Sequence, residues 1–303
     1  MKEKKKKTDH LLALIREGRP MTSGEQFRLT VALSVPAIVT QLSAIVMQYI
    51  DAAMVGSLGA NASASIGLVS TTTWLFWGLC AAASTGFSVQ VAHRIGADDW
   101  DCARSILRRS VPSTFAFSAL LAAIGVSVSG ALPQWLGGDS VIRSDASLYF
   151  LIFSLFLPIL QMNFLAAGML RCSGNMRIPS IAGVLMCILD VVFNFFLIFP
   201  SRELSAGGLT LSIPGAGLGV QGAALGTGLA ESVAAAITLW YLFTRSSGLK
   251  IKAWRKSPSL PAPPIIRNSI RISLPMGLDQ ILTRTYIHAA IYLPAVSTND
   301  FSA

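Results

Sequence analysis

Residues 33–59 read LSVPAIVTQLSAIVMQYIDAAMVGSLG, an almost unbroken apolar run. At about 1.5 Å per residue, an α-helix of this length would cross the hydrocarbon core of a bilayer. The run holds Pro36 near one end and Asp51 near the other. A carboxylate placed in lipid costs about 2.5–3.5 kcal/mol on insertion scales, so we expect Asp51 to face a cavity, a partner or an ion.

The composition of the whole chain indicates a membrane protein. Of its 303 residues, 52% are hydrophobic and 13% are charged, and the mean hydropathy is +0.59. These values exclude an ordinary soluble domain, and the apolar stretches lack the strict alternation of an outer-membrane barrel. We therefore expect an all-α polytopic membrane protein. Seven transmembrane helices are predicted, over residues 31–55, 62–92, 110–131, 146–170, 178–200, 217–244 and 270–296.

The net charge of +9 is distributed in a way that follows membrane topology. Of the 24 Lys and Arg residues, 8 precede residue 30 and 7 lie between Arg245 and Arg271, whereas the first loop has none. This is the positive-inside pattern, which predicts a multi-pass protein of the cell inner (cytoplasmic) membrane with a cytoplasmic N-terminus. We expect lipid headgroups, not nucleic acid, as partners of the basic residues. The four cysteines have neither extracellular positions nor metal-site spacing, so no disulfide or metal centre is predicted from them.

Two further acids lie inside the first six predicted helices. Asp190 is near the centre of the fifth span, and Asn194 follows one turn later on the same face. The first six spans contain no Lys or Arg that could form an ion pair with these acids, which favours an ion-binding role. In the sixth span Thr227 and Glu231 lie four residues apart among small residues that allow close helix contact.

Other polar segments have simpler explanations. The acids of residues 98–101 resemble the DDxxD metal motif of prenyl-transferring enzymes, but Cys102 stands where the last acid should be. We therefore expect a helix N-cap in a solvated loop. Gln161 and Asn163 in the fourth span could line a pathway or form interhelical hydrogen bonds. The loop of residues 201–219, rich in Gly and Ser, is predicted to be an irregular connector.

A short internal repeat suggests how the chain is divided. Residues 273–280 repeat the Ser-x-Pro and the later Gln of residues 34–41 at an offset of 239. A second half as long as the first would give roughly 450–480 residues, so the chain is expected to end after one helix of a second lobe. The predicted domains are a basic cytoplasmic tail (1–30), an N-lobe with six transmembrane helices (31–245), a cytoplasmic Pro-rich linker (246–269) and the first helix of an incomplete C-lobe (270–303).

Five stretches, taken in order, resemble the multidrug and toxic compound extrusion (MATE) transporters. They are VPAIVTQLSAIVMQYIDAAMVGSLG in the first helix, VAHRIGADD after the second, GMLRCSGNMRIP after the fourth, ILDVVFNFFLIF in the fifth and GVQGAALGTGLA at the start of the sixth. The resemblance spans nearly all of residues 29–297. It implies two six-helix lobes around a central cavity, and export of organic cations or other amphipathic compounds in exchange for H⁺ or Na⁺.

The resemblance also implies roles for individual residues. Pro36 would be the bending proline of the first helix, Asp51 the N-lobe acid, Asp190 the acid of the fifth helix and Thr227 the polar residue of the sixth. Many members have an asparagine one turn before the fifth-helix acid, where this chain has Met186. Asn194, one turn after that acid, is the candidate to replace it.

Together these inferences give one expected site. Asp51, Asp190, Asn194 and Thr227 are predicted to bind the coupling ion, either H⁺ or a Na⁺ held at Asp51 and Asp190, with no other cofactor. Gln48 and Glu231 are predicted to line the substrate cavity. The chain would then be a secondary active transporter and not an enzyme, with small amphipathic or cationic molecules as its substrates.

Three alternatives stay open. A lipid-linked precursor flippase of the same superfamily would share the fold, but the acids argue against the cationic cavity typical of such proteins. An intramembrane aspartyl enzyme built on Asp51 and Asp190 would need a GxGD signature, which is absent. Finally, the chain could be an inactive fragment unless a second copy or a separate C-lobe completes its cavity.

Overall fold

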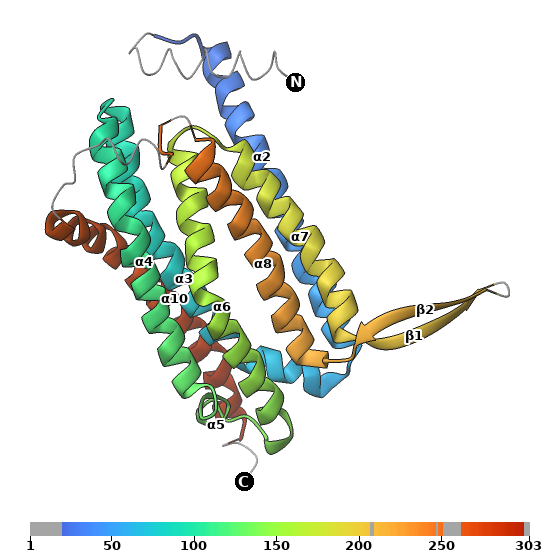
Figure 1. The fold of residues 1–303 in the computed structure, drawn as a ribbon. Coiled ribbons are helices and arrows are strands. Elements are labelled where there is room, and N and C mark those ends of the chain that lie inside the picture. The colour runs from blue at the N-terminus through green and yellow to red at the C-terminus, as the bar shows by residue number, and fades with distance from the viewer. Residues whose placement is uncertain (1–19, 207–208, 247, 251–261, 300–303) are drawn as a thin grey trace.

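The structure, a computed structural model, describes residues 20–206, 209–246, 248–250 and 262–299 (Figure 1). It is built almost entirely of long helices. Its elements are α2 (Ser23–Gly56), α3 (Ala60–Gly96), α4 (Trp100–Val128), the short α5 (Leu132–Trp135), α6 (Ser140–Cys172), α7 (Arg177–Ile198), the strands β1 (Pro200–Ala206) and β2 (Leu209–Ala216), α8 (Gly219–Thr244) and α10 (Ala262–Asn299).

Six of the described helices are long and apolar enough to cross a membrane: α2, α3, α4, α6, α7 and α8. They coincide with the first six predicted spans, which confirms a polytopic helical membrane protein. The seventh predicted span is also helical and lies within α10. It does not reach the same apolarity, because its sequence includes Arg271, Asp279 and Arg284.

The first helix begins earlier than predicted. We expected a solvated tail up to residue 30, but α2 starts at Ser23. Thr22 and Glu25 form a capping box, in which the Glu25 carboxylate accepts hydrogen bonds from the Thr22 backbone N–H and hydroxyl, both at 2.9 Å. The Thr-x-x-Glu signal sits in polar sequence, where hydropathy gives no indication of a helix. Residues 1–19 of the predicted tail lie outside the described residues.

The third span also begins early, at Trp100 instead of residue 110. The predicted N-cap explains why: the Asp99 carboxylate accepts a hydrogen bond from the Cys102 backbone N–H at 3.1 Å. The following turns carry arginines, which made this part of the helix resemble a loop. One of them, Arg104, donates to Asp101 at 2.8 Å. The N-cap interpretation of these acids is confirmed.

The predicted linker of residues 246–269 is partly helical. Residues 251–261 lie outside the described residues, but α10 starts at Ala262. Pro263 and Pro264 follow at once, and proline is well suited to the first turn of a helix because that turn needs no backbone donor. The prolines that suggested an extended linker therefore mark, at its end, the start of a helix.

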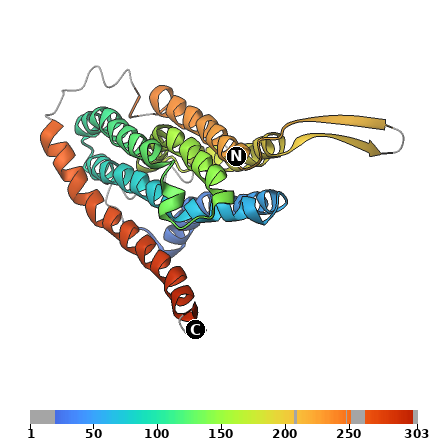
Figure 2. The same ribbon diagram turned by 90° about the horizontal axis from the view of Figure 1, so that it is seen from below.

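The loop of residues 201–219 is not an irregular connector. Its residues form an antiparallel hairpin in which Arg202 pairs with Ile213 and Ala206 with Leu209. The sequence has apolar residues at 209, 211 and 213, with two glycines at 207–208, a pattern typical of a hairpin. The hairpin projects away from one end of the helical bundle (Figures 1 and 2).

The helices pack in an order that places α6, α7 and α8 together. α6 packs against α3, α4 and α8, while α7 packs between α8 and α2. α10 crosses the outer face of α3, at the edge of the bundle opposite the hairpin (Figure 2). Apolar side chains of α3, α4 and α6 fill the core, including the fully buried Val69, Leu107, Phe150 and Leu157. The polar side chains that concern function lie on the other side of α6, along α7 and α8.

Candidate ion-binding site

Two glycines of α8 allow α7 to approach it closely. A β-carbon at Gly222 would meet the Leu197 backbone, and one at Gly226 would overlap the side-chain oxygen of Asn194. Small residues at such positions let helix backbones pack at short distance inside a membrane. The contact therefore brings the polar side chains of α7 directly against the neighbouring helix.

Asn194 joins the two predicted acids. Its side-chain Nδ2 donates to Asp51 Oδ1 at 2.9 Å and to Asp190 Oδ2 at 3.1 Å. Asp190 and Asn194 are fully buried on α7, with 0% and 1% of their surface exposed, whereas Asp51 is half-buried on α2. The amide thus links α2 to α7 and holds two carboxyl groups on one donor atom.

Two further side chains complete the surroundings of these acids. Thr227 on α8 lies near Asp190, and the Asp51 and Asp190 carboxyl groups are close enough to interact with each other. Tyr149 of α6 lies close enough to interact electrostatically with both acids. Two neighbouring carboxyl groups in a low-dielectric interior repel each other when both are ionised, so the pair favours a shared proton or a bound cation.

Oxygen atoms are available for such a cation. Asp190 Oδ1 and Asn194 Oδ1 are both buried without a hydrogen-bond donor. Carboxylate and amide oxygens are ligands that hard cations accept. The donor set is therefore compatible with Na⁺ as well as with a proton, and an unfilled buried acceptor of this kind needs an explanation in the protein's function.

Glu231 lies in a second polar group, with Asn163 and Thr238. Its carboxylate accepts a hydrogen bond from Asn163 Nδ2 at 2.8 Å, and Asn163 Oδ1 accepts one from the Thr238 hydroxyl at 3.0 Å. These contacts tie α6 to α8. Of the two alternatives for Asn163, the interhelical hydrogen bond is the one observed. Gln161 likewise donates to Ser84 on α3 at 2.7 Å.

The two remaining predicted residues lie on α2. Gln48 is on the exposed face of this helix, one turn from Asp51. Pro36 lies inside α2, thirteen residues after its start at Ser23. The Thr40 hydroxyl donates to the Pro36 carbonyl at 2.9 Å. Sequence reasoning missed Tyr149 and Thr238, because a single tyrosine or threonine in an apolar span carries no signal until its neighbours are known.

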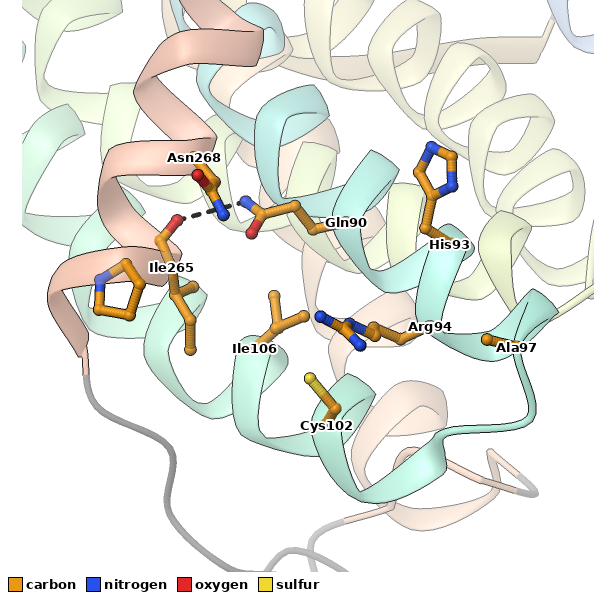
Figure 3. A pocket seen from close by; sticks show the side chains of 9 residues that line it. Gln90, His93, Arg94, Ala97, Cys102, Ile106, Ile265 and Asn268 are labelled. Carbon is orange, nitrogen blue, oxygen red and sulfur yellow. Dashed lines mark hydrogen bonds between the residues drawn. The ribbon is translucent and has the colours of Figure 1, made fainter.

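One pocket in the described residues lies away from the acids. It is an open pocket of about 440 Å³ between the C-terminal end of α3, the start of α4 and the start of α10. Gln90 crosses it to donate to the Ile265 carbonyl at 3.3 Å, and Arg94 borders it (Figure 3). Arg94 is paired with Asp99 at 3.4 Å. The pocket lies at the contact between α10 and the rest of the bundle. None of the predicted site residues lines it.

A bundle of membrane-spanning helices that keeps hydrogen-bonded carboxyl groups in its interior has the features of a membrane transport protein. The family model described as MatE matches residues 36–196. This match covers more than half of the sequence, and the chain belongs to the MatE family.

Curated relatives and solved structures agree with this assignment. The chain is 23% identical over 260 residues to a probable multidrug resistance protein NorM of Thermotoga maritima, covering 84% of this chain and 52% of the relative. It is 22% identical over 252 residues to an FAD transporter of Shewanella oneidensis, covering 80% and 53%. An outward-facing multidrug resistance MATE family transporter of the MOP superfamily has the same fold, with a TM-score of 0.72 and 22% identity over 84% of this chain and 52% of that one. The chain thus spans about half the length of the relatives that it matches.

Proposed function

We propose that the chain carries the coupling-ion site of a secondary active antiporter that exports cationic or amphipathic small molecules across the cytoplasmic membrane. The observation that supports this proposal most directly is the pair of hydrogen bonds from Asn194 to Asp51 and Asp190. These bonds gather two intramembrane acids from two helices at one point. The coupling ion is H⁺ or Na⁺, and its binding is expected to change how α2 packs on α7.

The membrane potential and the proton gradient can both supply free energy for export of a substrate. A membrane potential supplies about 2.3 kcal/mol per charge per 100 mV, and a proton gradient supplies about 1.4 kcal/mol per pH unit. Coupling arises if the ion and the substrate favour opposite-facing states, since each then weakens the binding of the other. Because the site joins α2 to α7, a change in how these two helices pack would change the contact between its acids.

Relatives give only a broad indication of substrate. One is named for multidrug resistance and the other for FAD transport. We propose organic cations, because the carboxyl groups of the bundle interior would attract positive charge. A lipid-linked precursor flippase is the alternative outcome, recognised by failure to move soluble dyes together with a cell-envelope defect on deletion.

The test is counterflow in vesicles. The protein is reconstituted into liposomes that contain a pH-sensitive dye, and ethidium, a planar organic cation, is added outside with and without Na⁺. We expect substrate-driven movement of H⁺ or Na⁺ that is lost in Asp51→Asn and in Asp190→Asn. Asp139→Asn, at an exposed acid before α6, serves as the matched control. Counterflow that survives in both site variants would show that the site assignment is wrong.

A further inference from the structure

Glu231 lies about one helical turn along α8 from Thr227, the residue of that helix near the Asp51–Asp190 pair. Thr227, which approaches Asp190, and Glu231 are four residues apart, about 6 Å along the helix axis. Thr238 lies two turns further toward the C-terminal end of α8. Asn163 connects Glu231 to Thr238 by hydrogen bonds of 2.8 and 3.0 Å. Polar groups therefore continue from the acid pair toward the end of the bundle at which α8 finishes.

The neighbours of Glu231 leave it without a compensating charge. On α7, Cys187 lies within electrostatic range of Glu231, Asp190 and Asp51, and Asp190 itself is within range of Glu231. α6 presents the neutral Asn163, and its Tyr149 lies within electrostatic range of the acid pair. Within the described residues, the ion pairs of Arg94 and Arg104 are with other acids, and none involves Glu231.

A carboxylate in these surroundings needs a cation to neutralise it, and a proton is the smallest one available. An isolated ionised carboxylate is very costly in an apolar interior, and a single amide donor offsets only part of that cost. Asn163 donates to Glu231, and its own oxygen lies 3.0 Å from the Thr238 hydroxyl, which also has the Ala234 carbonyl at 2.9 Å as an acceptor. The hydrogen bond from Asn163 holds the partly buried carboxyl group between α6 and α8.

We propose that Glu231 is a second proton-holding carboxyl group, distinct from the Asp51–Asp190 pair, through which protons pass between that pair and the C-terminal end of α8. The charge distribution predicts that this end faces the cytoplasm. The proposal rests on the proposed function for its biological role, but its chemistry can be tested separately. It replaces the expected role of Glu231 in the substrate cavity.

The experiment is infrared spectroscopy of the 303-residue chain in lipid nanodiscs, titrated with pH. A protonated carboxyl group has a carbonyl band apart from those of carboxylates and amides. We expect Glu231→Gln to remove one such band that persists in the Asp51→Asn/Asp190→Asn double variant. Asn163→Leu, which removes the donor but keeps the acid, is expected to shift that band. Asp139→Asn is the control and leaves it unchanged.

A second readout tests proton passage. After transfer to deuterated buffer, the Asp190 carboxyl band shifts as its proton exchanges. In Glu231→Gln we expect this exchange to slow by on the order of a hundredfold, the lower end of what one positioned proton-transferring side chain contributes. The proposal is overturned if Glu231→Gln removes no protonated band, or if exchange at Asp190 is as fast as in the parent protein. Loss of counterflow in the vesicle assay is a separate outcome and bears on the proposed function alone.

Discussion

Asn194 Nδ2 lies 2.9 Å from Asp51 Oδ1, across 143 residues of sequence. This bond connects α7, which packs between α8 and α2, to α2, the least buried of the six apolar spans. The same nitrogen also bonds Asp190, so both acids depend on one donor. We therefore expect the position of α2 against the bundle to depend on the protonation or cation occupancy of the acid pair.

The first prediction concerns this donor. Asn194→Leu keeps the side-chain size but removes both hydrogen bonds, and it leaves two carboxyl groups without their shared partner. Hydrogen bonds to charged groups contribute about 1.5–3 kcal/mol each, so we expect the free energy of unfolding to fall by about 2–4 kcal/mol. Unfolding in detergent micelles titrated with dodecyl sulfate measures the change. Asn268→Leu, at an exposed asparagine of α10, is the control, and equal stability of the two variants would contradict the role of Asn194.

The second prediction concerns the space beside Asn194. Gly226→Ala would place a methyl group where the Asn194 oxygen now lies, so the amide must rotate or α8 must move. Overpacking of this kind costs about 1–3 kcal/mol. We expect both lower stability and loss of any Na⁺-dependent rise in melting temperature.

The control for this variant is Gly67→Ala on α3, where a β-carbon meets nothing within 4 Å. Alanine there is expected to be neutral or slightly stabilising, because it favours the helix over the unfolded chain. If Gly226→Ala behaved like Gly67→Ala in both measurements, the close contact between α8 and Asn194 would not determine the geometry of the site.

Much of the fold was predictable from the sequence because lipid imposes a simple rule: a span must be long, apolar and helical. The leucine, isoleucine and phenylalanine runs locate α7 to within two residues at each end, whereas α6 begins six residues before its predicted start. The errors in the predicted spans are at the helix ends, because polar capping residues determine where a helix begins. Thr22 and Asp99 start helices in sequence that is charged and resembles a loop, and the Gly207–Gly208 pair separates two strands that hydropathy does not detect.

The site was predictable in part for a related reason. An acid inside a membrane span is conspicuous, so Asp51, Asp190 and Glu231 could be found by inspection. Their hydrogen-bond partners could not be found in this way. Contacts between α2 and α7, or between α6 and α8, depend on how the helices pack, and no sequence pattern reveals which helices are neighbours. Asn194 was predictable from its helical spacing to Asp190, but the bond to Asp51 was not. Glu231 is the clearest example of a partner that the sequence does not reveal, since its hydrogen-bond donor Asn163 is 68 residues away.

A third prediction tests the capping box. Thr22→Ala removes the hydroxyl that bonds Glu25, and loss of an N-cap costs about 1 kcal/mol. The effect is expected to be local: backbone amides of residues 23–27 should exchange with deuterium faster, while those around Asp51 keep their protection. Thr30→Ala removes only a hydroxyl that donates to the Gln26 carbonyl, and it serves as the control. Faster exchange throughout α2 in Thr22→Ala would show that the cap does more than fix the helix end.

The last prediction concerns how α10 docks on α3. At Gly86 a β-carbon would overlap the Ser273 hydroxyl and come within 2.6 Å of the Ser269 carbonyl oxygen. The same seam is held by hydrogen bonds from Ser273 to the Ala82 carbonyl at 2.8 Å and from Gln90 to Ser269 at 2.6 Å. Gly86→Val is therefore expected to displace α10 without unfolding α3.

Displacement of α10 also removes the Arg284 guanidinium from the Trp74 ring, where it now lies 5.4 Å from the ring centroid. Such a cation–π contact contributes about 0.5–2 kcal/mol, so its loss adds to the effect. We expect faster deuterium exchange across residues 265–284 in Gly86→Val and unchanged exchange in Gly67→Val, the open position on the same helix. Equal protection of α10 in both variants would mean that α10 is held by the end of the helix near Ile265 and not by the contact at Gly86.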